Sequence, residues 1–284
     1  MTDETNSTFD KDTMPFVAPC RSLSPFAAFR WIRLGIADYR RAPRQSLIYG
    51  VVMAVIIAVL SLGAWLYGSI WFMLAMLGGF VFLSPLACIG LYAIAAQLER
   101  GHEPSIARSL RAAFRRHIGN EMVFAIILLI IFLVWARAGA MVSVFFPTAA
   151  HPDISELRGY LAVGTLVGAV FAAVTFSASA FSLPMLMHRN VDSVTAIVTS
   201  INAVLRNKFA MMLWLAVIIF GLIVGTATAF VGMVFILPVI GYAAWHGYQE
   251  AIDASEFPRH TVGITAQPRA SSIDATVDTE TIGT

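Results

Sequence analysis

Four polar side chains that could bind a ligand lie at the ends of long apolar stretches: Glu99, His188, His246 and Glu250. Carboxylates accept hydrogen bonds, and imidazoles can donate or accept them. If the apolar stretches are helices that end at one face of a bundle, these side chains could form a polar vestibule at its inner mouth. The alternative is that they only mark the depth at which each helix reaches water.

No other cluster has the spacing of a catalytic or metal site. His151, Asp153 and Glu156 lie close together in the sequence, but their spacing matches no zinc or calcium motif. Hydroxyl groups within the apolar stretches, such as that of Ser84, have no neighbouring base, which nucleophilic chemistry requires. No G-x-x-x-x-G-K-[ST] phosphate loop occurs. We therefore expect no enzyme, with no catalytic residue, no metal ligand and no cofactor.

The composition indicates that membrane helices position these residues. Of the 284 residues 58% are hydrophobic and 13% charged, and the mean hydropathy is +0.76, whereas soluble domains carry about 25% charged residues. A helix crosses a bilayer with about 20 apolar residues, and alternating strand patterns are absent. Six such stretches occur, at 46–67, 71–96, 122–146, 159–187, 209–231 and 232–248. The chain is predicted to be an all-α, polytopic membrane protein with six transmembrane helices.

Basic residues predict the orientation, because short cytoplasmic loops collect Lys and Arg. Of the 19 basic residues, only Arg137 and Arg158 fall on one predicted side of the membrane. All the others fall on the opposite side, which also carries both ends of the chain. Both termini are therefore expected in the cytoplasm, and the formal charge of +2 gives no reason to expect a nucleic-acid partner.

The chain divides into three tandem units, each a cytoplasmic amphipathic helix followed by a transmembrane hairpin. These units form a membrane domain over 24–250, at about 24–101, 102–190 and 191–250. The two ends, 1–23 and 251–284, are rich in Ser, Thr, Asp, Pro and Gly and lack an apolar stripe. Such composition predicts disordered tails.

The amphipathic helices carry apolar residues at helical spacing. The first stripe consists of Phe29, Ile32, Ile36 and Tyr39, and the third of Val194, Ile197, Val198, Ile201, Val204 and Leu205. In the second helix Arg108, Arg111 and Arg115 lie beside the stripe and are expected to contact lipid headgroups. The alternatives are that the helices cover the inner mouth of the bundle or recognise a partner.

Three even-numbered spans contain the pattern F-x-x-P, ending at Pro85, Pro184 and Pro238. A proline within a helix removes one backbone donor and kinks the helix. Broken helices sometimes build transport sites near the membrane midplane. The simpler interpretation is a kink that neighbouring helices tolerate.

Small residues four positions apart occur in two spans. Gly164 and Gly168 form such a stripe in 159–187, and Gly221 and Gly225 form one in 209–231. Small residues let transmembrane helices approach closely. Because both stripes fall at matching depth, these two helices are predicted to touch.

Several short motifs resemble those of a known family. They are Gly78-Gly79-Phe80, Ser84-Pro85, Gly90-Leu91-Tyr92, Leu98-Glu99-Arg100-Gly101, Ser182-Leu183-Pro184-Met185-Leu186, Asp192, Asn207, Pro238-Val239-Ile240-Gly241 and Trp245-His246-Gly247-Tyr248. The region 24–250 resembles the bacterial integral membrane proteins grouped as domain of unknown function 2189. The resemblance implies an inner-membrane protein of about six helices without an established activity.

Some relatives in that family carry the label of a cytochrome c oxidase subunit. A haem-copper catalytic subunit needs several histidines inside its helices, and none of the six histidines here is predicted mid-span. Two hypotheses follow: a non-catalytic scaffold or assembly protein that contacts lipids and other membrane proteins, or a carrier for a lipid-like, hydrophobic solute. An accessory subunit of a respiratory oxidase is a third alternative.

Overall fold

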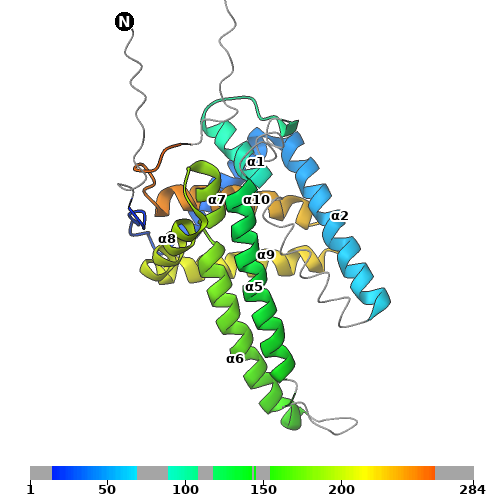
Figure 1. Cartoon of the computed structure of the whole chain (residues 1–284). Helices are drawn as coiled ribbons and strands as arrows, with labels where there is room; N and C mark the ends of the chain where they lie inside the picture. The colour runs from blue at the N-terminus through cyan, green and yellow to red at the C-terminus, as the bar shows by residue number, and fades with distance from the viewer. Residues whose placement is uncertain (1–14, 69–88, 108–117, 143, 145–153, 260–284) are drawn as a thin grey trace, which may run out of the picture.

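The computed structural model describes residues 15–68, 89–107, 118–142, 144 and 154–259 (Figure 1). Within these ranges the chain is helical, and its only extended pairings are two isolated bridges. The helices are α1 (Ala27–Arg41), α2 (Pro43–Tyr67), α5 (Ile118–Val142), α6 (Ile154–Ser179), α7 (Ser182–His188), α8 (Ser193–Arg206), α9 (Lys208–Ala227) and α10 (Met233–Ala251). A further short helix spans Ile89–Glu99.

Four helical segments in the described part are long and apolar enough to cross a membrane: Pro43–Gly63, Gly119–Val142, Leu157–His188 and Lys208–Ala227. They agree with four of the predicted spans and fit a polytopic membrane protein. Most of the predicted span 71–96 lies outside the described residues. The last predicted span, 232–248, is helical as α10 but does not reach the hydropathy of the other four. Six spans are therefore not confirmed.

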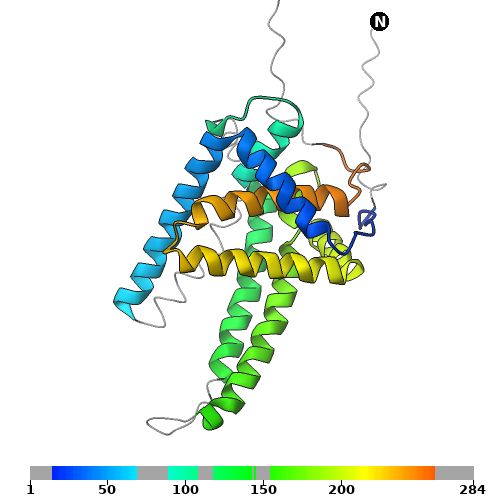
Figure 2. The same cartoon turned by 180° about the vertical axis from the view of Figure 1, so that it is seen from behind.

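The last two helices fold back on each other, as the length of the apolar run 209–248 predicted. α9 ends at Ala227 and α10 begins at Met233. Between them Ala229 and Phe230 adopt positive φ angles of 50° and 68°. In both views α9 and α10 run side by side across the direction of α5 and α6 (Figures 1 and 2). Three tandem hairpins that all point the same way are thus not confirmed.

α10 is tightly packed against α1 and α2. A Cβ atom on Gly35 of α1 would lie 2.6 Å from the Val239 carbonyl oxygen, and one on Gly50 of α2 would lie 1.9 Å from that of Val234. The Val234 carbonyl is the group that Pro238, lacking an N–H, leaves without its helical hydrogen bond. α2 therefore crosses α10 at the point where the proline interrupts its hydrogen bonding.

The amphipathic helices α1 and α8 expose part of their predicted apolar stripes and pack mainly through another face. In α8 the buried face consists of Ser193, Thr195, Ala196, Thr199, Ser200, Ala203 and Val204. Of the predicted stripe, Val194 is 50% and Leu205 57% exposed. In α1, Phe29 is 55% exposed while Ala28 and Trp31 are fully buried. Outward apolar stripes suit helices that contact acyl chains, and small residues suit helix packing in lipid.

The two chain ends pair with each other, which corrects the predicted domain boundaries. The Arg21 amide donates to the Ala251 carbonyl, and the Asp253 amide donates to the Pro19 carbonyl, each at 2.8 Å. Ala18 and Phe257 are only 1% and 2% exposed. Residues 15–23 and 252–259, which we call the terminal clasp, are therefore packed segments. The prediction of disorder over 1–23 and 251–284 was wrong for the clasp, and 1–14 and 260–284 lie outside the described residues.

Candidate functional site

An apolar cavity of about 650 Å³ lies among α5, α6, α9 and α10. Its walls include Trp135 of α5, Phe171 of α6, Trp214 of α9, Ala244 of α10 and Tyr92 of the short helix. The volume falls within the range of small-molecule sites, which are usually concave and mostly apolar.

Small residues on α6 make room for this cavity. Gly168 and Ala172 line it, and a Cβ atom added to Gly168 would meet no atom within 4 Å. Trp214 and Ile218 of α9 line the same space, so α6 and α9 face each other across it. A gap of this kind can remain in lipid because acyl chains satisfy apolar walls as well as protein does.

The prediction that the small-residue stripes of α6 and α9 touch was wrong. A Cβ atom on Gly221 would lie 3.0 Å from Ile236, and one on Gly225 would lie 2.5 Å from Met233, both on α10. Gly164 instead faces Val142 of α5 at 3.7 Å. The short turn after α9 places α10 against its small-residue face, which leaves α6 without that partner.

One polar group of the cavity wall, the Ser179 hydroxyl, is hydrogen-bonded within its own helix. The Ser179 hydroxyl donates to the Thr175 carbonyl at 2.7 Å. Among the described residues no group of three or more His, Cys, Asp or Glu could hold a metal ion. The wall thus offers apolar contact rather than acid–base or nucleophilic groups.

The three predicted kink prolines have different surroundings. Pro238 lies inside α10 and is buried, two residues before the cavity residue Ile240 and six before Ala244. Pro184 lies in the first turn of the short helix α7, where a missing N–H costs little. The preceding turn at Ala180 and Phe181 separates α6 from α7. Pro85 lies outside the described residues.

A second, polar cleft of about 250 Å³ lies beside the terminal clasp. Glu99 and His188 line it together, as the predicted vestibule required. The Trp245 indole N–H donates to Glu99 at 3.3 Å, and the Gln249 amide donates to the same carboxylate oxygen. His188 Nδ1 lies 3.0 Å from the Tyr248 hydroxyl.

Aromatic rings separate this polar cleft from the apolar cavity. Tyr92, in the cavity wall, stacks on Trp245 with ring centroids 6.3 Å apart. Trp245 in turn contacts His188 at 5.4 Å and Tyr248 at 5.9 Å, and these two line the cleft. One aromatic layer on α10 therefore forms the boundary between an apolar and a polar compartment.

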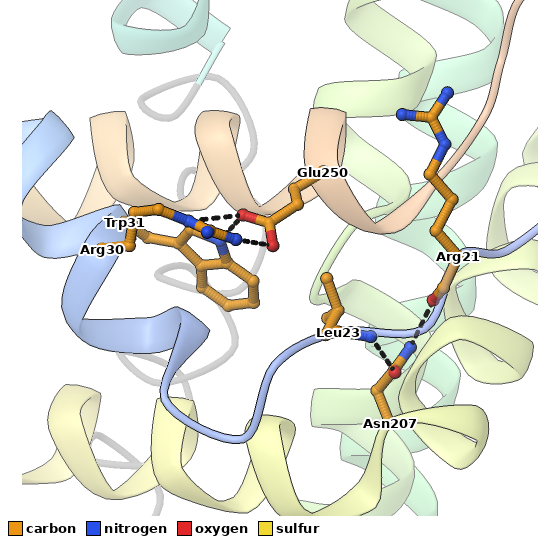
Figure 3. Close-up of polar contacts among 6 residues, drawn as sticks. All are labelled: Arg21, Leu23, Arg30, Trp31, Asn207 and Glu250. Atoms are coloured by element: carbon orange, nitrogen blue, oxygen red, sulfur yellow. Dashed lines mark hydrogen bonds and ion pairs between the residues drawn. The ribbon is translucent and has the colours of Figure 1, made fainter.

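The other two vestibule residues, His246 and Glu250, lie on a different face of α10, toward α1. His246 Nε2 lies 2.7 Å from the carboxylate of Asp38, which is 5% exposed. Figure 3 shows the carboxylate of Glu250 facing both Arg30 and Trp31, and the Trp31 indole N–H donates to it at 2.9 Å. Successive helical residues point about 100° apart, so His246 and Glu250 face α1 while Trp245 and Gln249 face the cleft. The prediction that these four residues form one vestibule was therefore wrong.

The remaining prediction concerns the headgroup arginines Arg108, Arg111 and Arg115, which lie outside the described residues. The sequence reasoning missed Arg189 and Arg259, which line the cleft. Arg189 was read only as an orientation signal and Arg259 as part of a tail. The apolar residues Ile252 and Phe257 interrupt the polar C-terminal stretch. They could have indicated that this segment packs against the protein.

The clasp, which carries Arg259, is fixed by Thr199 of α8 and by Asn207, the residue that follows α8. The Asn207 side chain accepts from the Leu23 amide at 2.8 Å and donates to the Arg21 carbonyl at 3.0 Å (Figure 3). The Ala18 amide donates to the Thr199 hydroxyl at 3.1 Å. Asp192 is the N-cap of α8, since its side chain accepts from the amides of Val194 and Thr195. Those hydrogen bonds to the ionised carboxylate lower the pKa of Asp192 despite its partial burial.

Comparison with known proteins supports the family resemblance. The model of the family described as "Predicted integral membrane protein (DUF2189)" matches residues 72–188. The matched region includes Glu99, His188 and the α5 and α6 walls of the cavity, and ends before α8. No curated protein and no solved structure matches the chain.

Proposed function

With a match to a family of integral membrane proteins and an apolar cavity among its helices, we propose that this protein binds a lipid-like, hydrophobic molecule in that cavity. The single observation that carries the proposal is the cavity itself, about 650 Å³ in volume and bordered by Trp135, Phe171 and Trp214. An acyl chain is the ligand best suited to such a wall, because it needs apolar contact and no hydrogen bonds.

A catalytic role has less support. The described wall contains the hydroxyls of Thr175 and Ser179 but no imidazole or carboxylate that could activate them. Its described residues include no histidine, so the wall offers no imidazole to bind a haem as an oxidase would.

The cavity distinguishes between the two non-catalytic hypotheses. A scaffold needs only a packed interior and exposed contact surfaces, whereas a carrier needs space for its solute beside a helix that can move. Pro238 lies two residues before Ile240 and six before Ala244, which both line the cavity, so its interrupted helix borders the proposed site. We therefore favour the binding or carriage of a lipid-like solute over a purely scaffolding role.

We further propose that the protein lies in a bacterial inner membrane with both termini in the cytoplasm. The distribution of Lys and Arg supports this orientation. The terminal clasp supports only the placing of both ends on one side, because the backbones of residues 19–21 and 251–253 are hydrogen-bonded to each other and must lie on the same side of a membrane. The six spans and their three tandem hairpins stay predictions for the whole chain.

Fluorescence quenching tests the proposed ligand, because Trp135 and Trp214 both line the cavity. The full-length protein in mild detergent is titrated with a fatty acid brominated along its chain, whose bromine atoms quench nearby indoles. Binding in the cavity predicts saturable quenching. Gly168→Leu would fill open space in the wall and should weaken that binding at least tenfold, about 1.4 kcal/mol.

The matched control is Gly159→Leu, on the same helix. A Cβ atom there would also meet no atom within 4 Å, and Gly159 is not among the residues that border the cavity. This variant should bind the brominated fatty acid like the unaltered protein. Equal quenching in the two variants would show that the fatty acid sits elsewhere, and the proposal would be abandoned.

A further inference from the structure

The polar cleft beside the terminal clasp is not used by the proposed function, and its charges are unevenly matched. Arg21, Arg189 and Arg259 border it, against the carboxylates of Glu99 and Asp253. Three guanidinium groups thus share the cleft with two acids. The inference that follows does not depend on the apolar cavity.

Both carboxylates are already engaged. Asp253 pairs with Arg21 at 2.8 Å, and hydrogen bonding from that guanidinium, followed by that from Ser255, lowers the pKa of Asp253 to about 2. Glu99 accepts from Trp245 and Gln249. Within the described residues, neither carboxylate forms an ion pair with Arg189 or Arg259.

Arg189 is buried with an incomplete set of partners. Its side chain belongs to a residue only 8% exposed, and one terminal nitrogen donates to the Phe257 carbonyl at 2.6 Å. Its Nε is buried and has no hydrogen-bond partner within the described part of the chain. A buried donor without an acceptor is costly, more so on a charged group.

The C-terminal segment of the same chain brings the guanidinium group of Arg259 close to Arg189. Arg189 and Arg259 are bridged through their backbones in antiparallel fashion, and the Asn190 amide donates to the Pro258 carbonyl at 2.9 Å. Burial lowers the pKa of Arg189 and the positive charge of Arg259 adds to that shift, while Tyr248 and the carboxylate of Asp253 oppose it. Asp253 is itself paired with Arg21, so within the described residues Arg189 and Arg259 have no carboxylate of their own.

We propose that this cleft binds a phosphate group through the guanidinium groups of Arg189 and Arg259. Guanidinium is planar and pairs with phosphate oxygens through two parallel hydrogen bonds. The Tyr248 hydroxyl and the His188 imidazole, which line the same cleft, supply further polar contacts. The phosphate can belong to the headgroup of an anionic lipid or to a free phosphate ion, and the chemistry of the cleft suits both.

The test uses the full-length protein in mild detergent. Inorganic phosphate is titrated calorimetrically, and in a second arm native mass spectrometry counts the phosphatidylglycerol and phosphatidylcholine molecules retained from an equimolar mixture. Arg259 is exposed at the cleft, so Arg259→Gln removes a charge without opening the core. We expect it to weaken binding at least tenfold in whichever arm detects binding.

Two further variants keep the result interpretable. Arg189→Lys keeps the charge but loses the planar fork and Nε, and should also weaken binding. Arg33→Gln removes an exposed arginine of α1 that is absent from the cleft, and should leave binding unchanged. Binding of inorganic phosphate indicates a free ion, whereas selective retention of phosphatidylglycerol alone indicates a headgroup. No binding in either arm, or equal losses in Arg33→Gln and Arg259→Gln, would overturn the proposal.

Discussion

The two sides of α10 are built in opposite ways. Toward α1 and α2, Gly35 and Gly50 bring backbones so close that a Cβ atom would collide with α10. Toward α6, Gly168 leaves open space and contributes to a cavity. Glycine thus allows helices to approach each other closely on one side of α10, and it leaves empty volume on the other side. The comparison shows that a small residue in a membrane helix does not by itself predict a helix contact.

The polar groups on the two sides of α10 also differ in how fully they are hydrogen-bonded. On the α1 side Glu250 accepts from Arg30 and from the buried indole of Trp31. On the cleft side Arg189 keeps a buried nitrogen without a partner. The α1 side therefore has the features of a structural interface, and the other side has features that a ligand could complete.

The largest expected effect is that of Gly50→Ala on the packed side. The added Cβ would lie 1.9 Å from the Val234 carbonyl oxygen and 2.7 Å from its carbon, so the backbones of α2 and α10 must separate. We expect a loss of about 3 kcal/mol, at the upper end of overpacking costs. Thermal unfolding in detergent, followed by tryptophan fluorescence, measures it. A melting temperature equal to that of the unaltered protein would contradict this packing.

Glu250→Ala should cost less, about 2 kcal/mol, because it leaves the buried Trp31 indole N–H without an acceptor. Glu250→Gln keeps an acceptor and should recover most of the loss. A double-mutant cycle with Trp31→Phe isolates the hydrogen bond, since Glu250→Ala should cost less when that donor is absent. Urea unfolding in mixed micelles provides the free energies. Additive losses would show that the two side chains do not interact.

The smallest expected effect is that of Gly168→Ala, and its sign is opposite to that of Gly50→Ala. The added methyl group would enter open space, and alanine is the better helix former by about 1 kcal/mol. We expect a stability gain of at most about 1 kcal/mol, seen as a higher melting temperature in the same assay. Destabilisation similar to that of Gly50→Ala would mean that α6 is closely packed at Gly168, which would remove the distinction between the two sides.

The sequence predicted the helices well, because length and apolar content define them locally. α2 and α9 lie within a few residues of the predicted spans 46–67 and 209–231. What the helices contact was predicted less well. In α8 the face that packs against the protein consists mostly of Ser, Thr and Ala, and the apolar stripe did not identify it. In lipid no hydrophobic force turns a stripe inward, so periodicity alone does not show which face contacts protein.

The sites could be predicted only in part, for the same reason. Glu99 and His188 share the cleft, but His246 and Glu250 do not, since the inner end of α10 meets α1 on one face and the clasp on another. The cavity depends on the spacing between α6 and α9, which no local pattern encodes. Arg189 and Arg259 are paired across 70 positions of the chain by the clasp, and composition alone suggested that this segment was unstructured.

The pairing of residues 19–21 with residues 251–253 also constrains how the molecule is made. Residues 15–23 leave the ribosome early, but their partners at 252–259 follow only after α10 has been synthesised. At ordinary elongation rates that delay is on the order of ten seconds or more. During this time Trp31, Cys20 and the inward face of α1 lack their final neighbours. Folding is therefore completed only when residues 252–259 pair with residues 15–23. Truncation of the chain before residue 252 would prevent that pairing.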